Sequence, residues 1–138
     1  MSDTFQLEII TPLRKYASRQ VESISVDTHF GQISIYAHHA DMIANVEISP
    51  LVMRTDGRVY QFAVSGGVLY CQCKENKVQL IVNAIESYDE IDLQRAIAEK
   101  VAAEKLLVDA KSVKEYNQAE IALKRAVNRI NVKKKVHY

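Results

Sequence analysis

Three arginines and two carboxylates near the C-terminus have the types and spacing for ligand chemistry. Arg125 and Arg129 are four residues apart in the stretch ALKRAVNRI. Asp92 and Arg95 are three apart in IDLQRA. Residues three or four apart share one helix face, so a hairpin of two helices would gather the arginines beside Glu86 and Asp92. Arginines with too few acids to pair them suit a polyphosphate, and a carboxylate accepts hydrogen bonds from a ribose hydroxyl or an adenine amino group.

A simpler interpretation makes IDLQRA only the first turn of a helix. In that case the helix dipole favours Asp92 at the N-terminus, and Asp92 forms a local ion pair with Arg95. The residues alone leave both interpretations open. Hydrolysis is not expected in either, because the chain has no glycine-rich phosphate loop and no magnesium-binding carboxylate pair with a positioned base.

Two other pairs of residues are of types that could bind a metal or take part in catalysis. His38 and His39 are adjacent in YAHHADM, where they could serve as a metal or acid–base pair. Cys71 and Cys73 share one face of a strand and could form half of a metal site. No nucleophile, second cysteine pair or ligand cluster accompanies them at a usable spacing. We therefore expect loop histidines and two small, partly buried thiols.

The arginine motifs need helices to position them, and no glycine or proline follows Ile85. Asp89 or Asp92 is expected to cap the first helix, and Ser112 or Asn117 the second. The alanine-rich inner stripes favour a closely packed antiparallel hairpin. Apolar and small residues recur at helical spacing in two runs, namely Leu93, Ala96, Ile97, Ala103, Leu107 and Ala110, then Tyr116, Ala119, Leu123, Ala126, Val127 and Ile130.

The preceding residues predict short strands. FQLEII and GQISIY alternate apolar and polar residues, which is the period of a half-buried strand. The pairs Asp56-Gly57 and Glu75-Asn76 lie between such runs and predict hairpin turns. Many short strands separated by turns indicate an antiparallel sandwich or barrel. The fold class is therefore α+β, mainly β in its N-terminal half, with a β domain at residues 1–87 and a helical hairpin at 88–138.

Composition narrows the classes of partner. The formal net charge of the 138 residues is +1, so no overall field draws the chain to nucleic acid or to an acidic membrane surface. No window approaches the roughly 18 apolar residues of a membrane span. The N-terminal residues MSDTFQLEII lack the pattern of a secretory signal. We expect a cytoplasmic protein without a nucleic-acid partner.

The order of these features resembles the epsilon subunit of bacterial F-type ATP synthase over about residues 5 to 133. LEIITP is similar to that family's first strand, and SGGVL to its S-G-G-x-L/V hairpin. IDLQRA matches its I/L-D-x-x-R-A motif, and ALKRAVNRI is similar to the second helix of members from Gram-positive bacteria. FGQISIYAHHADMI resembles the segment G-x-x-G-I-x-P-G-H-A-P-L-L, but Ser34, Ala37, His38 and Asp41 replace a glycine, a proline, a glycine and a proline.

The resemblance implies a β-sandwich of about ten short strands followed by an antiparallel two-helix hairpin. It implies a non-catalytic subunit of the central stalk, on the cytoplasmic face of the cell membrane, that contacts the membrane only through the complex. The sandwich would clasp the gamma subunit and rest on the ring of c subunits, coupling ion flow to ATP synthesis. The hairpin would fold onto the sandwich, or extend along gamma to the alpha/beta catalytic head and inhibit ATP hydrolysis.

The resemblance also implies a regulatory ATP site in the folded hairpin, with the presence of Mg²⁺ left open. Ile91, Asp92 and Ala96 would face the adenosine, and the arginines the phosphates. A further arginine of such members corresponds to Ala102 here. The loss of one charge-assisted contact of this kind costs about 1.5 to 3 kcal/mol, which predicts weak affinity. The matching positions are Glu86, Ile91, Asp92, Arg95, Ala96, Arg125 and Arg129.

Two alternatives belong to other classes of protein. The first is a free-standing nucleotide-sensing module that acts on another partner; copurification with a gamma-like chain would argue against it. The second is a small enzyme that uses the His38/His39 or the Cys71/Cys73 pair. Retained function after substitution of either pair would exclude that pair.

Overall fold

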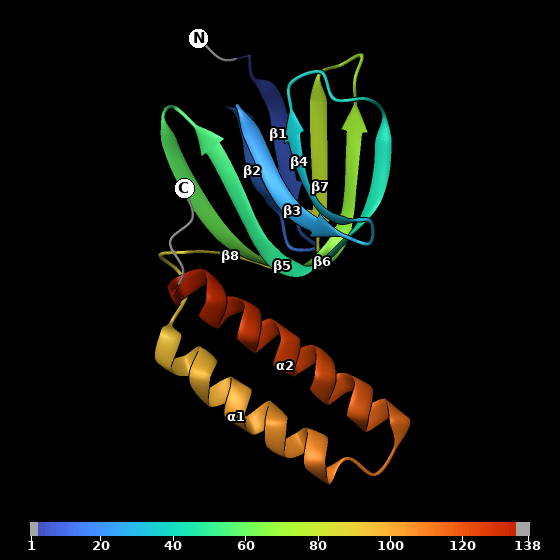
Figure 1. The fold of residues 1–138 in the computed structure, drawn as a ribbon, viewed down its shortest axis with the longest axis vertical. Coiled ribbons are helices and arrows are strands. Elements are labelled where there is room, and N and C mark those ends of the chain that lie inside the picture. Colours follow the sequence, from blue (N-terminus) through green and yellow to red (C-terminus); the bar gives the residue numbers. More distant parts are fainter. Residues whose placement is uncertain (1–2, 135–138) are drawn as a thin grey trace.

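The computed structural model describes residues 3–134, so residues 1–2 and 135–138 of the two predicted domains lie outside the described part. A β-sandwich stands at one end of the molecule, and a two-helix hairpin projects from it (Figure 1). The predicted α+β class is confirmed. The strands are β1 (Phe5–Ile10), β2 (Lys15–Val21), β3 (Ser23–Thr28), β4 (Gly31–Tyr36), β5 (Met42–Thr55), β6 (Arg58–Gln72), β7 (Lys77–Val82) and β8 (Ile85–Ser87).

The described residues form eight strands, fewer than the roughly ten expected, because β5 and β6 are long, at 14 and 15 residues. The sandwich was predicted to be antiparallel, but β1 and β7 pair in parallel. Residues 67–72 of β6 pair with β7, whereas residues 62–64 pair with β8. The strand order is β2-β1-β7-β6-β5-β3-β4, with β8 beside β6. The long β5–β6 pair thus links the two sides of the sandwich.

The predicted turns and the predicted alternation are both present. Asp56 and Gly57 have φ values of 53° and 71°, the left-handed pair that a two-residue hairpin with the natural strand twist requires. The loop before β7 holds Glu75 and Asn76, as predicted. In β1 every second side chain is buried and the others are half-buried. These inward residues join those of the other strands in one apolar core.

The hairpin consists of α1 (Leu93–Asp109) and α2 (Val113–Lys134). Asp92 caps α1, because its Oδ1 accepts from the Arg95 backbone N–H at 3.1 Å. Ser112 precedes α2, and its hydroxyl accepts from the Glu115 N–H at 3.1 Å. Two candidates were predicted for each cap, and the structure confirms Asp92 for α1 and Ser112 for α2. The helices run antiparallel (Figure 1), and the predicted small-residue seam is buried, namely Ala96, Ala103, Ala119 and Ala126.

Gly67 provides a first test of the sandwich. A Cβ at this position would collide with the Ile81 carbonyl oxygen and would lie 2.7 Å from Val82 Cα, both of which are backbone atoms of β7. We expect Gly67→Ala to destabilise the protein by about 3 kcal/mol or more, because the two strands must separate. Gly31→Ala is the control: it also has a positive φ but meets nothing within 4 Å, and should cost about 1 kcal/mol. Urea unfolding measures both, and equal losses would contradict this account.

Glu8 makes the stability of the sandwich sensitive to acid. Its carboxylate accepts from Gln79 at 3.0 Å and pairs with Lys77 at 2.9 Å and Lys15 at 3.1 Å, which joins β1 to both neighbouring strands. These contacts, led by the Gln79 hydrogen bond, lower the Glu8 pKa to about 2. A carboxyl whose folded pKa is depressed stabilises the fold above its unfolded pKa, and this stabilisation is lost as the pH falls towards 2.

We therefore expect the melting temperature of the wild type to fall more steeply between about pH 4.5 and pH 2 than that of Glu8→Gln. Glu47→Gln removes an exposed carboxyl of β5 and should follow the wild-type curve. Thermal unfolding across this pH range checks the expectation. Parallel curves for the wild type and Glu8→Gln would show that Glu8 contributes nothing to acid sensitivity.

Candidate functional site

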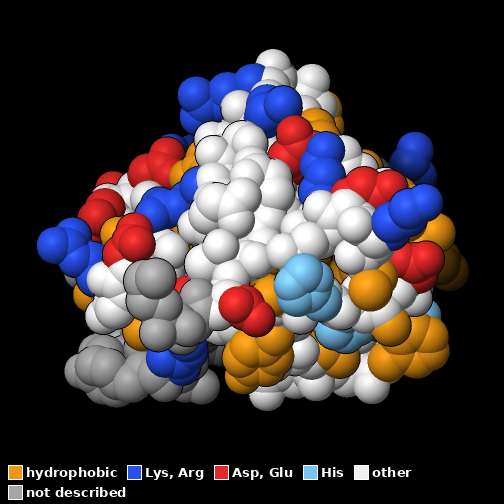
Figure 2. All heavy atoms as spheres, turned by 90° about the horizontal axis from the view of Figure 1, so that it is seen from above, with side chains coloured by type: hydrophobic (Ala, Val, Ile, Leu, Met, Phe, Trp, Pro, Cys, Tyr) orange, Lys and Arg blue, Asp and Glu red, His pale blue; other side chains and the backbone are white. Residues whose placement is uncertain are grey.

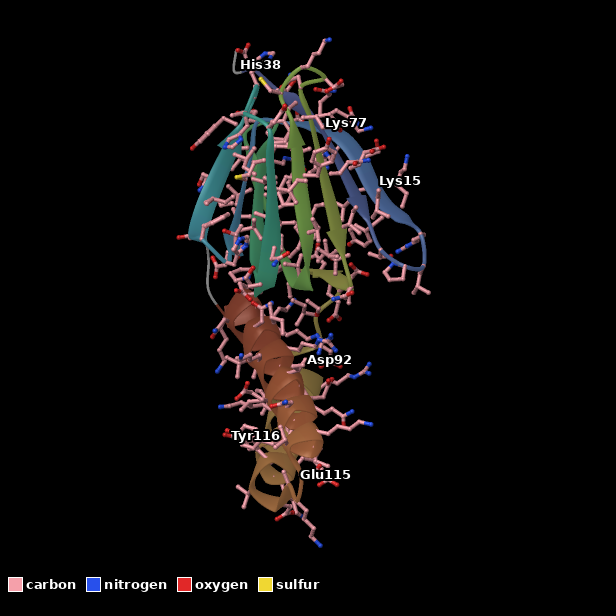
Figure 3. The ribbon with its side chains drawn as sticks, turned by 90° about the vertical axis from the view of Figure 1, so that its right-hand side faces the viewer. Lys15, His38, Lys77, Asp92, Glu115 and Tyr116 are labelled. Carbon is pink, nitrogen blue, oxygen red and sulfur yellow. The ribbon has the colours of Figure 1, made fainter. Side chains whose placement is uncertain are left out.

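The candidate site lies where the start of α1 and the end of α2 meet β8. Figure 3 shows Asp92 at this base of the hairpin, with Glu115 and Tyr116 at the far end of the helices and His38 at the opposite end of the sandwich. A pocket of about 160 Å³ opens there. Its lining comes from β8, the linker to α1, and both helices: Glu86, Glu90, Asp92, Arg95, Ala96, Glu99 and Arg129.

The predicted convergence of arginines is present in part. Arg95 and Arg129 line the same pocket together with Glu86. Arg125 lines a smaller hollow that shares Glu86 and Arg129 with the main pocket, so the three guanidiniums are neighbours without facing one cavity. Ala102, where the resemblance places a further arginine, is exposed on α1.

Acids in this pocket are more numerous than the sequence analysis expected. Arg129 donates through Nε to Glu86, and its NH1 lies 3.4 Å from Glu99. Glu99 also accepts from Arg95 Nε at 3.1 Å. Glu90 and Asp92 add two further carboxylates, which makes four acids against two arginines in the pocket lining. The expectation of too few acids to pair the arginines is therefore wrong for Arg95 and Arg129.

Arg125 differs from the other two arginines. Its Nε is buried and has no hydrogen-bond partner in the part of the chain that the structure describes. A buried charged donor without an acceptor is costly. The hollow beside it is only about 10 Å³, so an anion would reach this donor only after side chains move.

Asp92 and Ile91 have structural roles. The Asp92 carboxylate caps α1, whereas the ion pair that the simpler interpretation expected between Asp92 and Arg95 is replaced by the pair of Arg95 with Glu99. Ile91 is buried with Ala63 and Val132 in a small apolar cluster between the sandwich and α2, and it is not part of the pocket lining. Ala96 is buried in the helix seam and lines the pocket.

Glu90 is a pocket residue that the sequence analysis missed. Its carboxylate accepts from the Ser87 N–H at 2.9 Å and from the Tyr16 hydroxyl at 2.8 Å. The bond from Ser87, followed by that from Tyr16, lowers the pKa of Glu90. Burial and the bond to Glu90 raise the pKa of Tyr16 to about 12. Glu90 therefore stays ionised at neutral pH and ties the linker to β2.

Asn128 and Lys133 were also missed. Asn128 is buried in α2, and its side-chain amide donates to the carbonyl oxygens of Ser49 at 2.8 Å and Val64 at 3.3 Å. Lys133 donates to the Tyr88 carbonyl at 2.8 Å and lies 4.1 Å from the centre of the Tyr88 ring. These contacts hold the end of α2 to the sandwich and to the linker. Spacing could not reveal them, because their partners are distant in the sequence.

The cysteine and histidine pairs do not line this pocket. Cys71 is buried in the sandwich core, where burial raises its pKa to about 11. Cys73 is half-buried, and its thiol donates to the His38 carbonyl at 3.4 Å. His38 lies in a turn with a φ of 61°, and His39 contacts the carbonyl of Ala40. Across residues 3–134 no cluster of three metal-ligating side chains is found.

The end of the sandwich away from the hairpin has a mixed surface. Figure 2 shows hydrophobic side chains and histidines on one part of it, with charged side chains around the remainder. Phe30, Tyr36 and Ile43 are among the large apolar residues of the sandwich that are more than 60% exposed.

Neither helix in the described part of the chain is long and apolar enough to cross a membrane.

Residues 4–88 match the family model of the ATP synthase delta/epsilon chain β-sandwich domain, and residues 89–134 match that of its long α-helix domain. Curated relatives are bacterial ATP synthase epsilon chains. That of Caldanaerobacter subterraneus is 38% identical over 98% of this chain and 97% of its own, and that of Bacillus mycoides is 33% identical over 94% and 96%. The chain therefore belongs to the ATP synthase delta/epsilon chain family, and its relatives are of the epsilon type.

Solved structures share the fold. A chain in the Euglena gracilis mitochondrial ATP synthase superposes with a TM-score of 0.80 at 18% identity, covering 91% of this chain and 78% of the other. A chain in the central stalk and c-ring structure of the Tetrahymena thermophila enzyme gives 0.68 at 13% identity, covering 96% and 98%. At these identities the likeness concerns the fold alone.

Asn128 offers a direct test of hairpin docking. Asn128→Ala leaves two carbonyl groups without their donor, which should weaken docking by about 1 to 3 kcal/mol. Amide hydrogen exchange should then rise along residues 113–134 while the protection of β1 and β7 stays unchanged. Asn131→Ala changes an exposed residue of the same helix and serves as the control. Equal exchange in the two variants would show that Asn128 does not hold the hairpin.

Proposed function

We propose that this chain is the epsilon subunit of a bacterial F-type ATP synthase, with a β-sandwich that joins the gamma subunit to the ring of c subunits. In this role it performs no chemistry, and it meets the cytoplasmic face of the membrane only through the complex. Family membership over residues 4–134 supports the assignment. The exposed apolar residues of the sandwich support a surface that other subunits cover.

We further propose that the hairpin is a regulatory brake whose docked form binds ATP. The observation that carries this proposal is the origin of the pocket lining. Glu86 belongs to the sandwich, Arg95 to α1 and Arg129 to α2, so the complete pocket exists only when the hairpin is docked. A ligand that needs all three parts stabilises the docked state by its differential affinity.

ATP fits the site only after side chains move. A pocket of about 160 Å³ is smaller than the roughly 300 Å³ at which small-molecule sites begin. Arg125 would have to turn from its own small hollow towards the pocket, and Arg95 and Arg129 would have to exchange carboxylate contacts for phosphate contacts. This exchange supports weak binding, suited to sensing ATP at cellular concentrations.

Release of the hairpin accounts for inhibition when ATP is scarce. The helices expose several large apolar residues in the docked form, including Val101, Leu106, Val108 and Val113. Undocking would add the apolar cluster around Ile91 to this surface. An extended hairpin therefore needs a partner to cover it, and we assign that role to gamma and the alpha/beta catalytic head.

A calorimetric ATP titration tests the nucleotide site. We expect saturable binding by the isolated chain, weakened in Arg95→Ala and in Arg125→Ala by about 10- to 150-fold per lost phosphate contact. Arg58→Ala removes an exposed arginine from the start of β6 and is the control. Repetition with and without Mg²⁺ shows whether the metal accompanies the nucleotide. No binding at millimolar ATP would leave IDLQRA as a helix start only.

Copurification separates the stalk subunit from a free-standing nucleotide-sensing module. A complex with the gamma subunit that survives Arg125→Ala supports a stalk role that is independent of the ligand. A chain that stays monomeric beside gamma and still binds ATP would favour the free-standing module.

A further inference from the structure

Glu99 is the one carboxylate of the pocket that contacts both of its arginines. Its Oε1 accepts from Arg95 Nε at 3.1 Å, and its Oε2 lies 3.4 Å from Arg129 NH1. One oxygen thus faces a guanidinium of α1 and the other a guanidinium of α2. Two oxygens on one centre, shared between two arginines, imitate the way that a phosphate group is bound.

We propose that Glu99 is an internal competitor of the polyphosphate: its carboxylate pairs Arg95 and Arg129 while the hairpin is docked without ligand, and it must leave them when phosphates bind. This inference rests on the nucleotide site proposed above and defines how that site is regulated. In this account the Glu99 side chain lowers the affinity of the site for phosphate, and the total number of carboxylates in the pocket does not.

Two of the other three carboxylates of the pocket are held in place by other groups. Glu90 accepts from the Ser87 N–H and the Tyr16 hydroxyl, and Asp92 accepts from the Arg95 N–H as the cap of α1. Glu86 belongs to β8 and contacts Arg129 alone among the described residues, so it pairs one arginine and not both. Glu99 contacts the side chains of both arginines and has no other side-chain partner in the described part of the chain.

Exposure makes the Glu99 contacts exchangeable. The side chains of Glu99 and Arg95 are 43% and 79% exposed, and the pair is a helix-surface pair of residues four apart. Such pairs contribute little and exchange readily with solvent. Arg129 is 25% exposed and keeps its contact with Glu86 when Glu99 departs. Rotation of the Glu99 side chain therefore opens both arginines without disturbing the contact of Arg129 with the sandwich.

The same contacts join the two helices of the hairpin in the absence of ligand. Arg129 of α2 contacts Glu99 of α1 and, separately, Glu86 of β8. Loss of the Glu99 charge removes the ionic link between the helices and leaves the contact with the sandwich, so it should tighten phosphate binding without undocking the hairpin.

The experiment compares Glu99→Gln with Glu104→Gln, which changes an exposed residue of the same helix with no ion pair in the described part of the chain. Calorimetric titrations use ATP and inorganic tripolyphosphate as probes. We expect Glu99→Gln to bind both probes about three- to tenfold more tightly than the wild type, and Glu104→Gln to bind like the wild type. Glu99→Ala removes the same charge and should shift affinity in the same direction.

The outcomes separate this inference from the proposed function. Wild-type binding that Arg125→Ala weakens, together with unchanged or weaker binding by Glu99→Gln, would keep the nucleotide site and overturn the competitor. Binding by Glu99→Gln but not by the wild type would support the competitor and overturn ATP sensing by the natural chain. No binding by any variant to either probe would overturn both.

Discussion

The side-chain amide of Asn128 donates to two carbonyl oxygens of the sandwich, and the arrangement at the base of the hairpin depends on this contact. Asn128 lies in α2, whereas Ser49 and Val64 belong to β5 and β6. Close by, Val132 packs with Ile91 and Ala63. A buried amide that is satisfied in only one geometry sets the position of the helix more precisely than apolar packing does. Docking of α2 in turn brings Arg125 and Arg129 to Glu86, and so creates the site.

This attachment is small compared with the length of the hairpin. The far end of the helices projects away from the sandwich (Figure 1), and the described part of the hairpin exposes apolar residues along its length. The two helices are joined to each other by a buried seam of alanines, and only the base of the hairpin contacts the sandwich. Such a construction, with a two-helix hairpin on a limited contact, suits an element with two positions.

The ion pairs at the base of the hairpin are also weak and partly exposed. Arg129 is shared between a carboxylate of the sandwich and one of α1, and Arg95 shares the latter. Partly exposed pairs of this kind stabilise a contact weakly and exchange with other anions at little cost. The buried Nε of Arg125 has no partner in the described residues, and an anion would reach it only after side chains move. The proposed sensing of ATP and the proposed role of Glu99 both follow from this balance.

The sequence by itself determined the local structure. Alternation predicted the half-buried strands, Asp56-Gly57 predicted its turn, and the caps at Asp92 and Ser112 were among the candidates, because each depends on neighbours a few residues away. The order of motifs also identified the family. Only the tertiary structure decided that Ile91 packs into an apolar cluster, that β5 and β6 each run on as one long strand, and that Glu99 pairs two arginines. The carboxylates that pair with Arg129, those of Glu86 and Glu99, lie 43 and 30 residues away in the sequence. Packing of the whole domain selects such distant partners, and no local sequence pattern encodes them.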